Sequence, residues 1–477
     1  MKIQHITQHI ILAFLTILFW NCSSIQQQSV REINKIIPEK FQSSVDSTSI
    51  VEMNWKNYFK DKNLIALIDT ALVNNQELKI TLQEIEIRKN EIKARKGEYL
   101  PSIGIGGGAG LEKTAEFTRN GAVEKQLEIK PDKEFPEPLT DVRFGAYATW
   151  EVDVWKRLRN AKKSAVNQYL ASIEGKNFMV TNLIAEIADA YYELMGLDNL
   201  LKIINQNIEV QSNALLVAKK LKEAAKANQL AVNRFEAQLL NTQNLRYNIK
   251  QKIVETENRI NFLTARYPSP IQRSSTNFMN DIFTVAKVGF SSKLMENRPD
   301  IKQAEFELMA SKLDVKSAKA RFYPSFGISA GVGFQAFDPT YLVKPESLLY
   351  NLTGDLMAPL INRNAIKAAY SNANAKQIQS VIKYEQTILN AYLDVVNQMN
   401  KIKNYEESFN TKSKAVDILV SSIDIANKLF NYARADYSEV LFTQREALDA
   451  KIELIETKTE LFKSHVNIYR ALGGGWK

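Results

Sequence analysis

The feature that most restricts the fold of this 477-residue chain is an internal repeat. Residues 99–104 (YLPSIG) recur as residues 322–327 (FYPSFG), and residues 190–194 (AYYEL) recur as residues 391–395 (AYLDV). Similar runs in the same order at two places indicate that one structural plan is used twice. We therefore expect two structural repeats, at 55–289 and 290–477.

Each repeat places a pair of strands after its first helix. In the second repeat, residues 325–334 alternate between apolar and small or polar side chains, which is the period of a strand with two different faces. Its return strand is expected at 352–360. In the first repeat, a strand begins at Ile103 and returns over 144–150. Long loops are expected within the two pairs, at 111–140 and 335–350.

Four strands are too few for a soluble sandwich in a chain that is otherwise mostly helical. Strands of ~10 residues with one apolar face are the pattern of a membrane barrel. Such a barrel must close, because open strand edges are not tolerated in lipid, and three copies would supply twelve strands. The expected fold is mostly α with a trimeric, 12-stranded outer-membrane β-barrel, continued by a long coiled-coil α-helical barrel.

Long helices account for most of the remaining chain. Apolar residues recur every seven positions in both repeats, which indicates coiled-coil packing. The stretch 156–224 would reach ~100 Å as one helix, at 1.5 Å per residue. Shorter helices are expected at 64–96, with a break near Asn74 and Asn75, and at 299–321. The heptad residues are Val180, Ile187, Leu194 and Leu201, then Val381, Ile388, Val395 and Ile402.

The first residues have the pattern of an export signal. A polar segment with Lys2 precedes an apolar run at 10–20 that is too short to span a bilayer, so we expect a signal peptide at 1–21. Cys22 follows and is the only cysteine. Its position resembles the acylation site of a bacterial lipoprotein, which predicts a lipid-anchored segment at 22–54. The alternative is an unmodified cysteine after an ordinary secretory signal.

Composition argues against an enzyme and against a nucleic-acid-binding protein. The net charge is +9, but Lys and Arg are interleaved with Asp and Glu along the helical stretches, as on solvated helix faces. After removal of the signal, His465 is the only histidine, so the chain cannot build a His/Cys metal cluster. A catalytic triad would have to use His465, for which a surface or packing role is expected. No cofactor and no nucleic acid are expected.

Several motifs resemble those of TolC-like outer-membrane efflux proteins, and they occur in the family's order. Residues 150–155 (WEVDVW) with Arg157 resemble the family's strand-to-helix signature, although Lys156 stands where the family usually has Gly. The matches run from about Trp55 to the end of the chain, and the lipid-anchored, NodT-like branch fits best. The remaining matches are 229–238, 298–305, 318–324, 437–441 and 469–476.

This resemblance implies a homotrimer in the Gram-negative outer membrane, anchored by lipid and extending into the periplasm. Channels of this family dock to a periplasmic membrane-fusion adaptor, which links them to an inner-membrane pump, often of the resistance–nodulation–division class. The implied function is passive passage for drugs or other small molecules delivered by the pump. Two alternatives remain: a channel for type I protein secretion, and a periplasmic coiled-coil structural protein.

The resemblance also implies that the two helical hairpins turn at the adaptor. The expected contact residues are Ala225 and Lys226 in the first turn and Ala433 and Arg434 in the second. The family usually has Gly where this chain has Ala225 and Ala433. Because Ala adopts positive φ less readily than Gly, either the turns avoid positive φ or the match is shifted by a residue or two.

Asp436 and Glu439 are the expected gate residues beside the second turn. Three copies of Glu439 around an axis would form a carboxylate ring that selects cations or pairs across subunits. The alternative is an ordinary exposed Glu in the first turn of a helix, where the helix dipole favours an acidic side chain.

Overall fold

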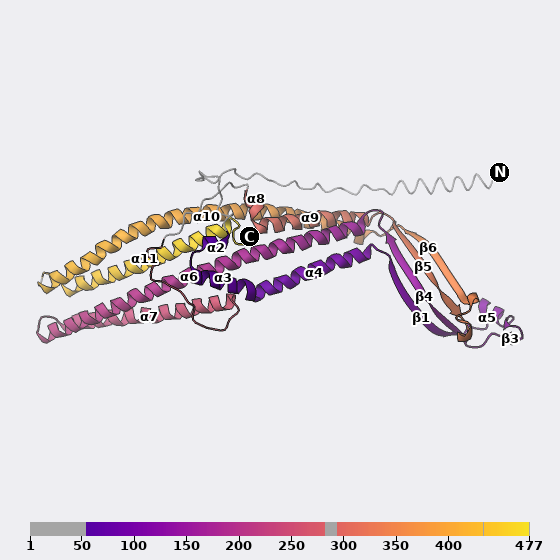
Figure 1. Ribbon diagram of the computed structural model, residues 1–477, viewed down its shortest axis with the longest axis horizontal. Coiled ribbons are helices and arrows are strands. Elements are labelled where there is room, and N and C mark those ends of the chain that lie inside the picture. The colour runs from indigo at the N-terminus through magenta and orange to yellow at the C-terminus, as the bar shows by residue number, and fades with distance from the viewer. Residues whose placement is uncertain (1–53, 282–292, 433, 477) are drawn as a thin grey trace.

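The structure, a computed structural model, describes residues 54–281, 293–432 and 434–476. The predicted signal peptide, Cys22 and residues up to 53 of the predicted anchored segment lie outside the described residues, as does Ala433. The molecule is elongated, with four strands that bend away at one end and two helical hairpins that finish at the other (Figure 1).

Two very long helices dominate the two halves of the chain. Helix α6 has 67 residues and α10 has 68, which confirms the expected length of ~100 Å. No helix in the part of the chain that the structure describes is long and apolar enough to cross a bilayer. The helices outside the strand-end loops are α2 (Trp55–Tyr58), α3 (Lys62–Asn74), α4 (Gln76–Glu98), α6 (Arg157–Glu223), α7 (Gln229–Leu263), α8 (Lys293–Asn297), α9 (Pro299–Ala320), α10 (Asn364–Asn431) and α11 (Tyr437–Ala471).

Asn75 makes the predicted break between α3 and α4. Its Oδ1 accepts a hydrogen bond from the Leu78 amide at 2.9 Å, which caps α4. Its Nδ2 donates to the carbonyl of Leu263 at 2.9 Å, at the end of α7. One side chain therefore starts a helix and ties it to another. Pro299 occupies the first turn of α9, as predicted.

The four long strands form one antiparallel sheet in the order β1-β4-β5-β6. Its register pairs Phe144 with Phe334 on one face and Glu151 with Gly327 on the other. The alternation of an apolar face with a small and polar face is therefore confirmed across the central strands. The strands are β1 (Ser102–Glu112), β4 (Leu139–Val152), β5 (Ser325–Ala336) and β6 (Leu348–Met357).

The position predicted for the last strand, 352–360, is wrong at both ends. Strand β6 starts at Leu348 and ends at Met357. Pro359 has no N–H to donate to a neighbouring strand, so the ladder stops before it. Every residue of β6 is exposed in the single chain, so the two faces of this strand do not differ in burial.

The two loops at the strand end carry short elements of their own. The first outer loop (113–138) holds α5 (Arg119–Glu124) and a hairpin of β2 (Glu128–Lys130) and β3 (Lys133–Glu134). The second outer loop (337–347) holds two 3-10 turns, η2 (Pro339–Tyr341) and η3 (Pro345–Ser347). Both loops fall within the ranges predicted for them.

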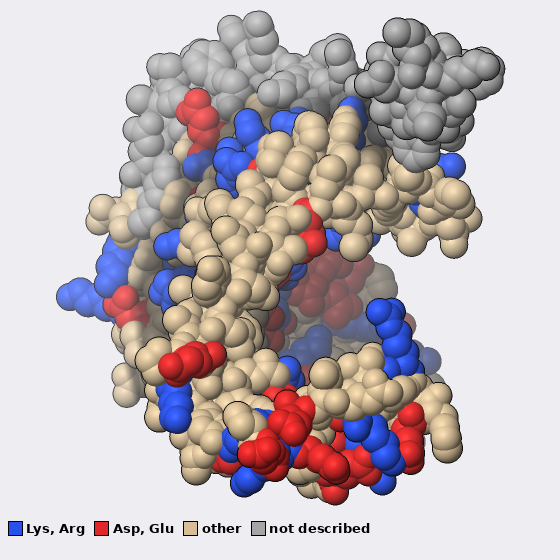
Figure 2. All heavy atoms as spheres, turned by 90° about the vertical axis from the view of Figure 1, so that its right-hand side faces the viewer, with Lys and Arg blue, Asp and Glu red and all other residues tan. Residues whose placement is uncertain are grey.

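The long helices form one curved layer whose members change along its length. Next to the strands, successive packed neighbours are α4, α6, α9 and α10; toward the hairpin ends they are α7, α6, α11 and α10. Seen from the strand end, the molecule is a wall hollowed on one side (Figure 2). Both halves of the chain thus build a single wall with two free edges.

The core lies where the two arrangements of helices meet. The heptad residues Ile187 and Leu194 of α6, together with Val381 and Val395 of α10, are at most 1% exposed and belong to one apolar cluster. The heptad pattern therefore identified buried positions in both halves. Because the two sets share a cluster, the halves are not independent folding units.

Helix α2 binds the C-terminal helix through an aromatic contact. The ring of Tyr58 stacks on that of Tyr469 with centroids 4.3 Å apart, and its hydroxyl donates to the carbonyl of His465 at 2.6 Å. The imidazole of His465 is buried, so this residue has the packing role that was one of the two expected. Burial lowers the pKa of His465 to about 4.

Candidate functional site

The strand-to-helix junction begins with a sharp reversal after β4. Lys156 adopts a left-handed conformation with φ 62°, which explains a preference for Gly at this position. Asp153 then caps α6, because its carboxylate accepts hydrogen bonds from the amides of Leu158 at 3.0 Å and Arg159 at 2.9 Å. Burial would raise the pKa of Asp153, but the Arg159 and Leu158 amides outweigh burial and hold it below its usual range.

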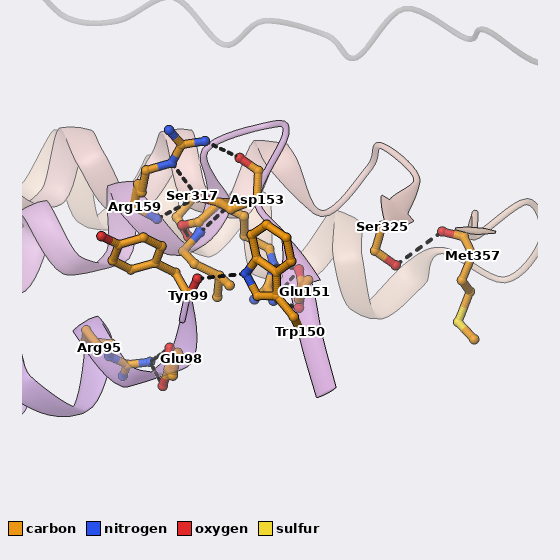
Figure 3. A network of polar contacts seen from close by, with 12 residues as sticks. Arg95, Glu98, Tyr99, Trp150, Glu151, Asp153, Arg159, Ser317, Ser325 and Met357 are labelled. Atoms are coloured by element: carbon orange, nitrogen blue, oxygen red, sulfur yellow. Dashed lines mark hydrogen bonds and ion pairs between the residues drawn. The ribbon is translucent and has the colours of Figure 1, made fainter. Parts of the chain in front are cut away.

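Two tryptophans attach the junction to both copies of the repeated motif, and Figure 3 shows the contact made by Trp150. The indole of Trp150 donates to the carbonyl of Tyr99 at 3.1 Å. The indole of Trp155 donates to the carbonyl of Pro324 at 2.8 Å, and its ring stacks on Tyr323 at 4.8 Å. The 99–104 and 322–327 runs therefore meet at one place. Tryptophan and tyrosine at this level suit the boundary between a membrane and water.

An ion pair and a hydrogen bond lock the first turn of α6. Arg157 binds the carboxylate of Glu151 at 2.6 Å, and Ser317 of α9 donates to the carbonyl of Arg157 at 2.9 Å. Arg157 had been recognised as part of the signature, whereas Ser317 and Arg159 carried no recognisable signal. The role of Ser317 depends on helix packing that links residues 160 positions apart, and that of Arg159 on the chain reversal that returns it to Asp153.

The hollow of the wall contains a groove of about 1080 Å³ between α4, α6, α9 and α10. Its floor includes small residues of α6 and α9, such as Ala171, Gly175 and Ala310. Three acidic and three basic side chains line it, so their formal charges balance. A broad, polar and open surface of this kind suits the passage of solutes better than the recognition of one ligand. The charged residues are Glu84, Arg88, Glu307, Asp314, Lys376 and Lys383.

The first hairpin turn has the geometry of a helix ending that is usually made with glycine. Ala225 has a φ of 57°, and the amide of Lys226 donates to the carbonyl of Leu221 at 2.8 Å. The alternative that this turn avoids positive φ is therefore wrong, because Ala225 itself adopts the left-handed conformation. The observed bond of the Lys226 amide holds the left-handed residue in place.

The second hairpin turn repeats one of these bonds. The amide of Arg434 donates to the carbonyl of Leu429 at 2.8 Å, as Lys226 does to Leu221. Asp436 precedes α11 without a side-chain capping hydrogen bond, and the amide of Glu439 donates to its carbonyl at 3.1 Å. Arg434, Asp436 and Glu439 are exposed, and within the described part of this chain they form no ion pair.

Comparison with known proteins places the chain in a family. Residues 67–266 and 290–474 match the family described as outer membrane efflux protein. The chain belongs to this family. It is thus an outer-membrane channel of a tripartite efflux system, and not an enzyme. As a Gram-negative outer-membrane channel, it extends into the periplasm.

Individual relatives are distant but cover nearly the whole chain. The solvent efflux pump outer membrane protein SrpC of Pseudomonas putida is 24% identical over 88% of this chain and 87% of its own length. The cation efflux system protein CusC of Escherichia coli O6:H1 is 22% identical, over 89% and 88%. The solved structure of the outer-membrane channel OprN has a TM-score of 0.82 at 22% identity, covering 94% of this chain and 98% of that one. The efflux protein therefore has the fold of that channel.

Proposed function

We propose that this efflux protein works as a closed ring of three copies, each built from the repeats 55–289 and 290–477. Four strands from each copy form the outer-membrane barrel, and the helices form the periplasmic duct. Its hairpin ends bind a periplasmic membrane-fusion adaptor, which connects it to an inner-membrane pump of the resistance–nodulation–division class. Cys22 carries the lipid that anchors residues 22–54 to the outer membrane.

The observation that carries this proposal is that exposed apolar residues lie along the free edges of the wall, on the strands and on the helices. At the strand end, β1 exposes Ile103 and Ile105 and β6 exposes Tyr350 and Leu352, each by 75% or more. These two strands have no partner on their outer sides within the sheet. A copy that joins its β1 to the β6 of its neighbour would satisfy both edges.

The helical edges carry apolar stripes with heptad spacing. On the α4 side, Val73, Ile80 and Ile87 lie seven residues apart and are at least 60% exposed. Toward the hairpin ends, the α7 stripe consists of Leu240, Tyr247 and Val254. The α10 stripe consists of Ile418 and Ile425 and of Tyr432, the residue directly after the helix. Residues of both stripes are at least half exposed.

A stripe on each of two different edges fits a head-to-tail contact, and such a contact forms a ring when its rotation closes. Heptad stripes also suit the coiled-coil packing of a helical barrel. Closure by three copies gives the twelve strands of a small membrane barrel, since each chain contributes four.

Replacing Tyr247 with Asp tests the ring. A charge in the middle of the α7 stripe should shift the purified protein from trimer to monomer in light scattering, because it would be buried without a partner. Asn248→Asp is the matched control, since Asn248 is exposed on the same helix outside the stripe. A trimer that survives Tyr247→Asp as well as Asn248→Asp would count against this contact.

The hairpin ends support an adaptor contact because they expose the charged residues Lys226 and Arg434 at the end of the molecule opposite the strands (Figure 1). Photo-crosslinkers placed at Lys226 and Arg434 in cells should capture the adaptor, while one at exposed Lys93 of α4 should not. Capture of the same protein from all three positions would contradict docking through the tips. The pump would then be identified from the captured adaptor's own partner.

The cargo is proposed to be small molecules rather than proteins. SrpC is named for solvent efflux and CusC for cation efflux, so relatives of similar distance differ in cargo. The balanced charges of the groove support passage without strong selection by charge. The described residues contain no group of three His, Cys, Asp or Glu side chains placed to hold a metal ion.

A further inference from the structure

A lysine from the first outer loop inserts between polar and aromatic groups of the second. The ammonium nitrogen of Lys130 lies 4.1 Å from the ring centroid of Tyr341 and 5.5 Å from that of Phe337. It is also 3.9 Å from Oδ2 of Asp338. A second ammonium nitrogen, that of Lys344 in the second loop, lies 4.5 Å from the centroid of the Tyr341 ring. The side chain of Lys130 is 30% exposed, so it is partly withdrawn from water.

The second outer loop builds this enclosure without help from the first. The rings of Phe337 and Tyr341 meet edge to face at 5.7 Å. Asp338 is oriented by Thr340, whose hydroxyl and amide donate to Oδ1 at 2.7 and 2.9 Å, which leaves Oδ2 toward Lys130. The carbonyl of Tyr341 accepts from the Ser347 hydroxyl at 2.8 Å. We call Phe337, Asp338 and Tyr341 the ammonium cage.

Two aromatic faces beside one carboxylate are the chemistry that recognises organic ammonium ions. The ring quadrupoles attract a cation over their faces, and the attraction strengthens as the cation loses water. The carboxylate adds a single opposite charge. A bound ammonium group, that of Lys130, already occupies the cage and serves as the internal example of its ligand.

We propose that the ammonium cage is a binding site for free organic ammonium ions at the outer mouth of the channel. In the observed structure Lys130 fills the site and thereby fastens the first outer loop to the second. A quaternary or primary ammonium ion that enters the cage displaces Lys130 and releases the first loop. The binding step itself needs no transport, so its failure would leave the proposed channel function untouched.

Displacement has to overcome the advantage of a tethered competitor. A side chain held close to its site acts at an effective concentration in the millimolar range or above. Free ammonium ions should therefore bind the unchanged protein weakly. Replacing Lys130 with Met keeps most of the length of the side chain and removes its ammonium group from between Tyr341, Phe337 and Asp338, so binding should become at least about tenfold tighter.

The test uses the full-length protein and tetramethylammonium, with binding measured by saturation-transfer NMR. Lys130→Met should bind tighter than the unchanged protein, and Tyr341→Leu should abolish binding in either background. Lys344→Met should bind as weakly as the unchanged protein, because Lys130 still lies beside Tyr341, Phe337 and Asp338. A Lys130→Met protein that binds no better than Tyr341→Leu would overturn the site.

Loop release is measured by cleavage with a glutamate-specific protease, since the first outer loop contains Glu116, Glu124 and Glu128. Tetramethylammonium chloride should speed cleavage of the unchanged protein several-fold over the same concentration of sodium chloride. Lys130→Met should be cleaved rapidly without either salt. Equal acceleration by sodium would reduce the effect to ionic screening and overturn the role of the cage.

Discussion

The guanidinium of Arg298 donates a hydrogen bond to the carbonyl oxygen of Ala471 at 2.9 Å, and so joins the start of α9 to the end of α11. The last carbonyls of a helix have no partner within the helix and carry partial negative charge. Arg298 also binds Asp300 at 2.6 Å and lies 3.6 Å from Asp394 of α10. One buried cation thus fixes three helices around the C-terminal end of the chain.

Replacing Arg298 with Ala should lower the free energy of unfolding by about 3 kcal/mol, because it leaves the carboxylate of Asp300 with little water, no cation and the Ile301 amide as its remaining donor. Urea unfolding followed by circular dichroism measures this change. Arg434→Ala, at an exposed turn, should change it by less than about 0.5 kcal/mol. Similar losses for the two variants would argue that Arg298 contributes no more than a surface charge.

Two groups, Asp189 of α6 and His465 of α11, should make the stability of the protein depend on pH in opposite senses. Burial raises the pKa of Asp189 to about 6, even though the amide of Asn467 donates to it at 2.9 Å. The native state therefore binds a proton more readily than the unfolded state, so the contribution of Asp189 to stability grows as pH falls from about 7 to about 4. Asp189→Asn should remove this contribution and raise the melting temperature at pH 7.

His465 should act in the other direction. Its folded pKa of about 4 lies below the ordinary value of 6.5, so the unfolded state binds the proton first as pH falls. Its contribution is fully present above pH 6.5 and is lost as pH decreases toward 4. Melting temperatures of Asp189→Asn and His465→Gln between pH 4 and 8 should therefore change with opposite slopes relative to the unchanged protein. Slopes of the same sign would refute the assignment.

How far the sequence predicted this fold depended on the range of each interaction. The period of seven in α6 and α10 and the period of two in β5 are local signals, and both were read correctly. The Arg298–Ala471 bond joins residues 173 positions apart, and the Lys130 cage joins two loops. No local pattern encodes such contacts, because they arise only when the helices and strands are packed.

The hairpin turns and gate residues could be predicted from the sequence in position but not in conformation. Their positions were expected from the resemblance to the family, and the structure places Ala225 at the first turn, as that resemblance implied. The conformation of Ala225 was beyond the sequence, since Ala is compatible with either a left-handed or a right-handed turn residue. The closed ring also lies beyond a single chain, although its edges carry the stripes from which it is inferred.

Ala225→Gly should stabilise the first hairpin turn by ~0.5 kcal/mol. Gly removes the strain of a left-handed Cβ, and part of that gain is offset by the greater freedom of Gly in the unfolded state. Ala224→Gly is the matched control, because Ala224 has a φ of −81° and no such strain. It should destabilise the protein by a similar amount. Hydrogen exchange at the Lys226 amide would report the local change, and slower exchange in both variants would contradict it.

Asp153→Ala should loosen the strands from the helices while leaving each intact. It removes the cap of α6 and the partner of Arg159, with a loss of about 2 kcal/mol. Trp155→Phe keeps the stacking on Tyr323 and removes only the hydrogen bond to Pro324, so it should lose about 1 kcal/mol. The temperature at which the assembled barrel dissociates in detergent would rank the two. Equal loss from both would mean that the cap contributes no more than one neutral hydrogen bond.

Glu439→Gln should reduce the preference of the reconstituted channel for cations. Three copies of Glu439 that face the axis near the hairpin ends would attract cations into the duct through their carboxylates. The reversal potential in a salt gradient measures this preference. Asp449→Gln is the control, because Asp449 is exposed further along α11 and pairs with Arg445 at 3.7 Å. A reversal potential that shifts as much for Asp449→Gln, or not at all for Glu439→Gln, would favour an ordinary first-turn glutamate stabilised by the helix dipole.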